Sequence, residues 1–513
     1  MKTIRSTSRL TSTPRLRCPL LVFCLVSLGF YHPGRAEAAE AKQPNFVFVY
    51  TDNLGYGDIA CFGHPTHRTP HLDQMAAEGM KLTHFYSTSG VCTPSRASLM
   101  TGCYPRRVGM DFPEPDGAVL RPMSPNGLHP DEVTVAEVLK SVGYATHMIG
   151  KWHLGDQPVF LPTRQGFDSW LGIPYSDNAH RRENRPHWPE LPLMRNEKVI
   201  VQPVDPDTLT SRYTDDAIRF IREQKETGTP FFLYMPQAMP GSTTSPAAGP
   251  MFKGRSNNGP WCDSIEELDW SMGEILKTLD ELDLTENTLV IWTSDNGAPR
   301  RTPPQGRNLP MGGWGYTTAE GGHRVPCIAY WPEKIAAGTV CDELTSTIDI
   351  LPTFAKLAGA EVPTDRVIDG KDIWPLLAGH PGATTPHDAF YYYSLDQLQC
   401  VRSGKWKLHL PLEHRYTNLS GKDAGPSEGK LFDVVADPGE TQNHYAERPE
   451  VVAELMAIAE RAREDLGDWD RPGKHVRPVG HIDTEPKPQL IESNQSTEPD
   501  QSTEPKRPIQ ATR

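Results

Sequence analysis

Four apolar segments, spread over the first 293 residues, constrain the fold of this chain more than any other feature. They span residues 45–51, 144–149, 231–235 and 288–293. Between them lie amphipathic stretches of helical period, one opened by the capping-box pattern Thr134–Glu137 and another by Asp263–Glu266. A short strand that is apolar on both faces is typical of a buried parallel sheet. The alternation therefore predicts an α/β fold, in which helices cover both faces of a large sheet.

The first 38 residues have the pattern of an export signal. Several arginines precede an apolar run from Pro19 to Tyr31, and Ala36-Glu37-Ala38 offers a cleavage site. The run is too short to span a bilayer comfortably, and no later stretch is long and apolar enough to do so. We therefore expect a signal peptide over residues 1–38, no membrane span, and an exported protein that is periplasmic or secreted.

After the expected signal peptide, the sequence divides into three segments of different composition and periodicity. Residues 39–384 carry the alternation of strands and helices and form the expected main domain. Residues 385–470 hold short strand-like pieces separated by turns, followed by a helix from Pro449 to about Leu466, which predicts a small antiparallel sheet with a terminal helix. Residues 471–513 are polar and Pro-rich and repeat Gln-Ser-Thr-Glu-Pro, so we expect a disordered tail there.

The formal net charge of −13 argues against a nucleic-acid partner. An acidic protein can still bind an anion where local basic groups, a metal ion or a helix N-terminus supply a positive field. Removal of the leader leaves seven cysteines without a Cys-x-x-Cys pair, which argues against a zinc ribbon. Because seven is odd, at least one thiol lacks an internal disulfide partner.

Acid–amide pairs follow two of the expected strands. Asp52-Asn53 comes directly after the first, and Asp295-Asn296 stands at the end of the fourth. Ligands of open α/β sheets bind at the carboxyl ends of strands, and oxygen ligands favour Ca²⁺ or Mg²⁺ over zinc. The alternative is that each pair only caps a turn.

The segment Cys92–Gly102 predicts a short helix that begins near a cysteine. Pro94 suits the first turn of a helix, and Gly102 suits its end. Cys92 would then lie where free N–H groups and the helix dipole attract an anion, with the guanidinium of Arg96 one turn further on. A catalytic cysteine and a purely structural one are both compatible with this pattern.

The stretch Gly150–Gly155 follows the second strand and holds Lys151 and His153. One could supply charge and the other a proton donor to the same cleft, or the stretch could be a surface loop with a packed tryptophan. Taken with the oxygen ligands and the cysteine helix, these residues suit an ester of phosphate or sulfate. The residue pattern does not choose between the two esters.

These motifs resemble those of the type I sulfatases. The stretch Cys92-Thr-Pro-Ser-Arg-Ala-Ser-Leu-Met-Thr-Gly102 matches the Cys-x-Pro-Ser-Arg signature of that family, in the manner of its arylsulfatase A and N-acetylgalactosamine-6-sulfatase branch. Further matching motifs lie at residues 51–58, 69–73, 150–155, 166–168, 294–297, 320–322 and 437–440. The resemblance implies an alkaline-phosphatase-like fold with a mostly parallel central sheet. It also implies a sulfuric ester hydrolase, which we expect to act on a sulfated carbohydrate.

The resemblance further implies roles for individual residues. A maturation enzyme would oxidise Cys92 to formylglycine, whose hydrate is the nucleophile. Arg96 and Lys151 would hold the nucleophile and neutralise charge, while His153 would assist proton movement. Ca²⁺ would act as a Lewis acid on the sulfate oxygens. Its ligands would be Asp52, Asn53, Cys92, Asp295 and Asn296.

Three positions depart from the family pattern. Asn53 stands where a second Asp is usual, Gly241 where a His is usual after Met-Pro, and Gly315 where a Lys is usual before Glu-Gly-Gly. The departures leave two alternatives, a sulfatase-like binding protein with little or no turnover and a phosphoesterase on the same fold. If position 241 still faces the substrate, a histidine placed there should raise the activity. The basic residues that could replace the lysine are Arg300, Arg301 and Arg307.

Overall fold

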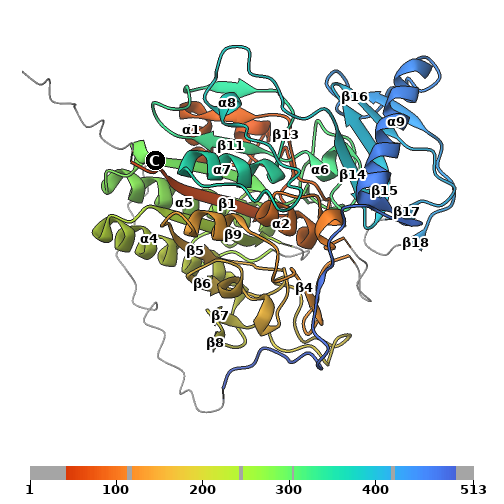
Figure 1. The fold of residues 1–513 in the computed structure, drawn as a ribbon. Coiled ribbons are helices and arrows are strands. Elements are labelled where there is room, and N and C mark those ends of the chain that lie inside the picture. The colour runs from red at the N-terminus through yellow and green to blue at the C-terminus, as the bar shows by residue number, and fades with distance from the viewer. Residues whose placement is uncertain (1–41, 112–117, 242–245, 303–304, 418–421, 493–513) are drawn as a thin grey trace, which may run out of the picture. The chain divides into compact units, whose positions relative to one another are not determined.

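Strand β1 (Asn45–Asp52) lies in the middle of the main sheet and is buried along its whole length (Figure 1). The computed structural model describes residues 42–111, 118–241, 246–302, 305–417 and 422–492. The expected signal peptide lies outside these residues. Successive side chains of a strand point to opposite faces, and accordingly Phe46 and Phe48 join one core cluster while Val47 and Val49 join another. This two-sided burial explains why the segment is apolar throughout.

Ten strands form the main sheet, in the order β12-β2-β11-β10-β1-β9-β5-β6-β7-β8. The five strands from β10 to β6 in this order are parallel, whereas β11, β7 and β8 run antiparallel to their neighbours. The prediction of a large, mostly parallel sheet is therefore confirmed. The bounds of the nine other strands are β2 (Met80–Leu82), β5 (Ala145–Ile149), β6 (Ser169–Gly172), β7 (Leu193–Arg195), β8 (Lys198–Val201), β9 (Phe231–Pro240), β10 (Thr288–Ser294), β11 (Cys327–Tyr330) and β12 (Thr339–Cys341).

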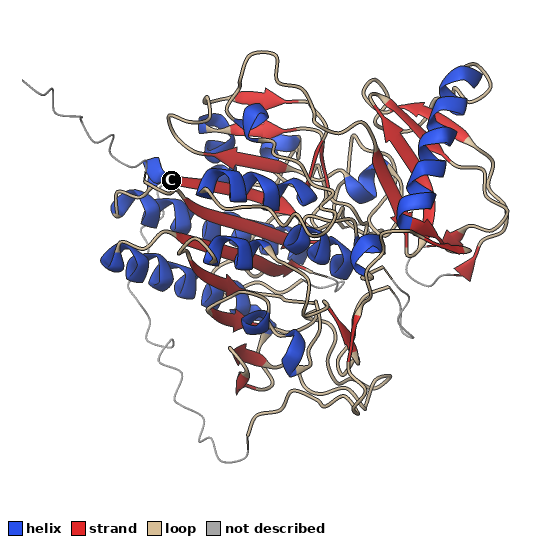
Figure 2. Ribbon diagram, viewed as in Figure 1, coloured by secondary structure: helices blue, strands red, loops and turns tan. Residues whose placement is uncertain are grey.

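Helices cover both faces of this sheet (Figure 2). The face of Val47 packs against α1 (Pro70–Glu78), α4 (Leu209–Thr227) and α5 (Gly259–Glu281). The face of Phe46 packs against α2 (Cys92–Thr101), α3 (Val135–Lys140), α7 (Ile350–Ala358) and α8 (Trp374–Leu377). The predicted capping box at Thr134 is present, and α5 begins four residues before the expected start at Asp263.

A second, antiparallel sheet is formed by β14 (Phe390–Ser394), β15 (Gln397–Ser403), β16 (Trp406–His409) and β19 (Lys430–Asp433). Helix α9 (Pro449–Leu466) packs on it and shares its core cluster, as the sequence predicts. Short strand pairs complete the structure: β3 (Phe85–Tyr86) with β13 (Thr345–Ser346), β4 (Asn126–Gly127) with β22 (Gly480–His481), β17 (Tyr416–Thr417) with β18 (Lys422–Asp423), and β20 (Gly467–Asp468) with β21 (Arg471–Pro472).

A buried ionic cluster joins the small sheet to the segment between β10 and β11 of the main sheet. Lys407 of β16 has its Nζ 3.0 Å from Glu320 Oε1, in α6 (Glu320–His323), and 3.1 Å from Glu440 Oε1. The hydroxyl of Tyr86 donates to Glu320 Oε2, and the hydroxyl of Tyr392 donates to Oε1, the oxygen that Lys407 also contacts. Lys407 and Glu320 are fully buried, so their charges are shielded from solvent, and Arg324 Nη1 lies 3.8 Å from Glu320 Oε2 as a second cation.

The prediction of a disordered tail is wrong for residues 473–492. Residues 473–492 form an extended strap that returns along the main domain, where β22 pairs with β4 (Figure 1). The main chain of Lys487 exchanges two hydrogen bonds with the amide of Gln157, and Arg477 forms a bidentate ion pair with Glu132. Backbone hydrogen bonds of this kind need no apolar periodicity, which is why a polar, Pro-rich sequence conceals them. The remainder, residues 493–513, lies outside the described residues.

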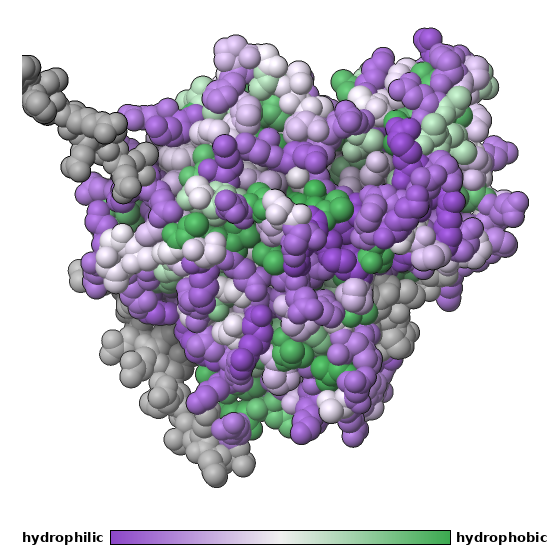
Figure 3. All heavy atoms as spheres, viewed as in Figure 1, coloured by the Kyte–Doolittle hydropathy of each residue, from purple (hydrophilic) through white to green (hydrophobic). Residues whose placement is uncertain are grey.

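The surface mixes hydrophilic and hydrophobic side chains, with hydrophilic ones prevailing on the face drawn in Figure 3. Within the described ranges, no helix is both long enough and apolar enough to cross a membrane. The seven cysteines of the described part of the chain are all free thiols, so no disulfide braces this part of the fold.

Candidate active site

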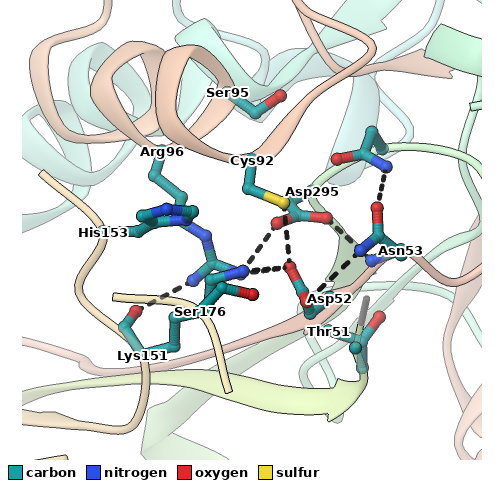
Figure 4. Close-up of polar contacts among 12 residues, drawn as sticks. Thr51, Asp52, Asn53, Cys92, Ser95, Arg96, Lys151, His153, Ser176 and Asp295 are labelled. Atoms are coloured by element: carbon teal, nitrogen blue, oxygen red, sulfur yellow. Dashed lines mark hydrogen bonds and ion pairs between the residues drawn. The ribbon is translucent and has the colours of Figure 1, made fainter. Parts of the chain in front are cut away.

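The acid–amide pairs meet because their strands are neighbours. Strands β1 and β10 pair in parallel with Thr51 opposite Ser294, so Asp52 and Asp295 follow at the same edge of the sheet. The backbone N–H of Asn53 donates to Asp295 Oδ1 at 2.9 Å. Helix α2 and the stretch after β5 bring further polar side chains to this point (Figure 4). The predicted convergence of polar groups at the strand ends is thus observed.

Cys92 lies at the first position of α2 and points toward the sheet edge (Figure 4). Its Sγ lies 3.2 Å from Asp52 Oδ1, and only 4% of the residue is exposed. Burial, followed by the charges of Asp295 and Asp52, raises the pKa of the Cys92 thiol well above its usual value. An unmodified thiol here stays protonated and is a poor nucleophile at neutral pH.

Two cations neutralise the two carboxylates beside this thiol. Arg96 Nη2 lies 2.7 Å from Asp295 Oδ2 and 3.2 Å from Asp52 Oδ1, and Lys151 Nζ lies 2.7 Å from Asp52 Oδ1. All four side chains are fully buried. Burial opposes ionisation of Asp52, but Lys151 and Arg96 together hold its pKa well below the usual value. Burial and the neighbouring Asp52 raise the pKa of Asp295 to about 7.

His153 presents one ring nitrogen to the site. Its Nε2 lies 2.9 Å from the carbonyl oxygen of Leu120, so the proton belongs on Nε2 and the lone pair on Nδ1. Nδ1 is buried and has no hydrogen-bond partner among the described residues. Burial, Lys151 and Arg96 lower the pKa of His153 well below its usual value, which keeps the ring neutral. Lys151 and His153 are both 0% exposed, so the alternative of a surface loop is wrong.

The amide residues complete a cluster of oxygen donors. Asn296 Nδ2 donates to Asn53 Oδ1 at 2.6 Å, while the buried Asn296 Oδ1 has no partner among the described residues. Potential ligand atoms of Asp52, Cys92 and Asp295 lie within 4.8 Å of one another. Carboxylate and amide oxygens suit a hard cation such as Ca²⁺, so this donor set fits the expected ion. Asn53 adopts a left-handed backbone with φ of 64°, which also serves the turn after β1.

The two glycines at the positions usually held by histidine and lysine have no room for side chains. Gly241 has a φ of 77°, and a Cβ there would lie 2.8 Å from the carbonyl oxygen of Ala238 and 3.1 Å from the carboxylate of Asp177. A Cβ at Gly315 would lie 2.1 Å from the carbonyl oxygen of Gly297. The backbone at position 241 therefore disfavours a side chain, and we expect a histidine there to lower the activity and not to raise it.

Of the three candidate arginines, Arg301 is the one that contacts Gly241, the position where the family usually has a histidine. Its Nη2 donates to the carbonyl oxygen of Gly241 at 2.6 Å, and its Cζ lies 5.0 Å above the ring of Trp261. The N–H of Gly241 in turn donates to the carbonyl oxygen of Asp52 at 3.1 Å. From the sequence, Arg301 is only one of three candidates, and the carbonyl of Leu120 that fixes the tautomer of His153 has no sequence signal.

Comparisons with known proteins agree with this geometry. Residues 44–360 match the model of the family described as Sulfatase, and residues 317–465 match the model described as N-sulphoglucosamine sulphohydrolase, C-terminal. The chain is 40% identical to arylsulfatase A of Homo sapiens, over 80% of this chain and 84% of that protein. It is 38% identical to N-acetylgalactosamine-6-sulfatase of Canis lupus familiaris, over 73% of each chain.

A solved structure extends the agreement to three dimensions. The PsFucS1 sulfatase from Pseudoalteromonas sp. superposes with a TM-score of 0.72 at 28% identity, covering 82% of this chain and 89% of that chain. Two sulfatase relatives are thus more than 30% identical to this chain, and the family model spans more than half of its length. The chain therefore belongs to the type I sulfatase family and is a sulfuric ester hydrolase with an alkaline-phosphatase-like fold.

Proposed function

We propose that this protein hydrolyses a sulfate ester of a sulfated carbohydrate, using formylglycine made from Cys92 as its nucleophile and Ca²⁺ as its cofactor. The name N-acetylgalactosamine-6-sulfatase describes a sulfatase that acts on a sugar, and we extend this substrate class to the present chain. The two alternatives, a binding protein without turnover and a phosphoesterase, receive no support from the comparisons.

The position of Cys92 carries this proposal. Its side chain lies at the beginning of α2 and 3.2 Å from a carboxylate that Arg96 and Lys151 already neutralise. Because burial keeps the thiol protonated, sulfur chemistry at neutral pH is disfavoured there. Oxidation by a maturation enzyme would replace the thiol by an aldehyde, whose hydrate offers an oxygen nucleophile instead.

The oxygen donors beside Cys92 would hold the cation. Asp52, Asp295 and the unpartnered Asn296 Oδ1 provide the donors, with Asn53 as a further neutral one. When bound, Ca²⁺ would polarise the sulfate oxygens. The neutral Asn53 in place of a carboxylate removes one negative charge, so we expect weaker cation binding than with an aspartate.

The chain's own side chains would bind the sulfate and move protons. Arg96 and Lys151 are held with their charged groups at the nucleophile, where they offset the negative charge that develops during ester cleavage. His153 has a neutral ring and an open Nδ1, so it can accept a proton from the nucleophilic hydroxyl. The carbonyl of Leu120 fixes that tautomer by accepting the proton on Nε2.

Mass spectrometry and turnover together test the proposal. Protein co-expressed with a formylglycine-generating enzyme should show a lighter peptide containing Cys92, and should hydrolyse a sulfated sugar in the presence of Ca²⁺. Cys92→Ala should abolish turnover, whereas Cys61→Ala, a thiol outside the site, should leave it unchanged. An unmodified Cys92 in active protein would refute the nucleophile, and faster cleavage of the matching phosphate ester would refute the substrate class.

We also propose that the protein is exported, because of the leader pattern in residues 1–38. Sequencing the mature N-terminus of protein recovered from its host tests this. A mature chain that begins just after Ala38 supports export with cleavage, and an intact Met1 in the cytoplasm contradicts it.

A further inference from the structure

Two cations of the candidate active site are already paired with its acids. Arg96 contacts the carboxylates of Asp52 and Asp295, and Lys151 contacts that of Asp52. These ion pairs fix both cationic side chains, but they also offset their charges. A sulfate ester brings a negative charge of its own, so a cation at the edge of the site that has no acidic partner would attract it more strongly than this pair does.

Among the described residues, Arg301 is a cation of this region that forms no ion pair. Its Nη2 donates to the carbonyl oxygen of Gly241 at 2.6 Å, and its buried Nε has no hydrogen-bond partner within the described ranges. A guanidinium carries several N–H donors, so most of them remain available to a ligand. Burial lowers the pKa of Arg301, and the charges of Tyr316 and Asp52 counteract this effect. The group is therefore a cation at neutral pH.

Contacts place this guanidinium at the edge of the site. The carbonyl of Gly241 accepts a hydrogen bond from Arg301, and the N–H of Gly241 donates to the carbonyl oxygen of Asp52 at 3.1 Å. The guanidinium is thus two hydrogen bonds away from Asp52, whose Oδ1 lies 3.2 Å from Cys92 Sγ. Strand pairing fixes this arrangement, because Asp52 lies opposite Pro240 in the register of β1 and β9.

An indole ring holds the side chain of Arg301 in place. The Cζ of Arg301 lies 5.0 Å from the centroid of Trp261, whose Nε1 donates to Asp58 Oδ1 at 3.2 Å. Trp261 is 3% exposed and belongs to α5, so the ring is a rigid support. The main chain that leads to Arg301 is fixed as well, because Pro299 forms a β-bridge with Gly315. A cation that is already ordered loses little entropy when it binds a ligand.

We propose that Arg301 binds the sulfate group that is cleaved at Cys92, from the side of Gly241. This inference rests on the proposed sulfatase function and adds a substrate-binding residue to it. The N–H groups of Arg301 that Gly241 does not occupy would donate to sulfate oxygens, in the forked geometry that suits an oxyanion. A guanidinium stays charged and transfers no proton, so the contribution of Arg301 is electrostatic.

Chemical rescue of Arg301→Ala tests this role. The variant should lose about a hundredfold in kcat/KM for 4-nitrophenyl sulfate, as expected when a donor to a developing negative charge is removed. Guanidinium ion in the buffer should restore at least about tenfold of this loss, because the carbonyl of Gly241 and the ring of Trp261 remain to hold it. Urea has the same shape without the charge and should restore nothing.

Arg222→Ala is the matched control. It removes an exposed positive charge in the last turns of α4, which leads to the start of β9, and it should match the wild type with guanidinium, with urea and with neither. The inference would be overturned by an unchanged kcat/KM in Arg301→Ala. It would also be overturned by a loss that guanidinium does not relieve, or that urea relieves equally, because either pattern assigns Arg301 a packing role on Trp261.

Binding of inorganic sulfate separates this inference from the proposed hydrolysis. In Cys92→Ala protein with Ca²⁺, Arg301→Gln should raise the Kd for sulfate about tenfold, measured by calorimetry, and Arg222→Gln should leave it unchanged. If the wild type cleaves no sulfate ester but this difference is present, the proposed hydrolysis fails and the role of Arg301 stands. If the Arg301→Gln substitution leaves the Kd unchanged, Arg301 does not bind the sulfate group.

Discussion

Replacement of Gly241 should damage the active site instead of restoring it. A side chain at this position would have to keep a φ of 77°, which costs an L-residue about 1–2 kcal/mol. Its Cβ would also lie 2.8 Å from the carbonyl oxygen of Ala238, a contact that forces the backbone to shift. We expect Gly241→Ala to lower the free energy of unfolding by about 2–4 kcal/mol in total, with Gly241→His at least as harmful.

Gly228→Ala provides the matched control. Gly228 has a φ of 69°, and nothing lies within 4 Å of a Cβ built on it, so this variant measures the backbone cost alone. Urea denaturation of the two alanine variants isolates the contribution of the contacts at position 241. Because Gly241 donates to the carbonyl of Asp52, kcat/KM for a sulfate ester should fall at least about tenfold in Gly241→His. A stable Gly241→His variant with raised kcat/KM would refute this reasoning.

Three further predictions concern the packing of the protein. Lys407→Met should cost about 3 kcal/mol in urea denaturation, because it removes the cation that two buried glutamates share and leaves Glu440 with His409 at 2.6 Å and Glu320 with Arg324 at 3.8 Å; a cost below about 1 kcal/mol would contradict this. Burial raises the pKa of Asp269 to about 7, so the folded state binds its proton more tightly than the unfolded state and stability falls as the pH rises from about 4 to about 7. Asp269→Asn should reduce that fall, measured as the urea midpoint against pH, and Asp280→Asn on the exposed side of the same helix should not. Deletion of residues 473–513 should lower both the thermal midpoint and kcat/KM, while deletion of residues 493–513 alone keeps every described strap contact and should change neither.

The sheet and its strand ends could be predicted because their signals are local. An apolar run such as residues 45–51 indicates that both faces of the strand are buried. An acid–amide pair directly after it indicates which edge of the sheet holds polar groups. The two strands were expected at equivalent positions, and their parallel register then placed Asp52 beside Asp295. The sequence predicts only that both pairs lie at one edge of the sheet, and the strand order of the structure makes β1 and β10 neighbours.

The remaining features depend on contacts between distant segments. The tautomer of His153 is set by the carbonyl of Leu120, and a backbone carbonyl carries no sequence signature. The exclusion of a side chain at Gly241 follows from its φ and from the carbonyl of Ala238, neither of which the amino-acid type reveals. The strap was missed for the same reason, since its contacts are backbone hydrogen bonds and ion pairs without periodicity.

The strap also has a consequence for incomplete forms of this enzyme. His481 meets Asn126 across 355 positions of sequence, and the segment that it braces contains Leu120, which orients His153. A nascent or clipped polypeptide can thus possess all the groups needed for catalysis while the support behind them is still absent. We therefore expect a polypeptide without residues 473–492 to keep the main sheet but to lose turnover, because the segment around Leu120 would lack this support.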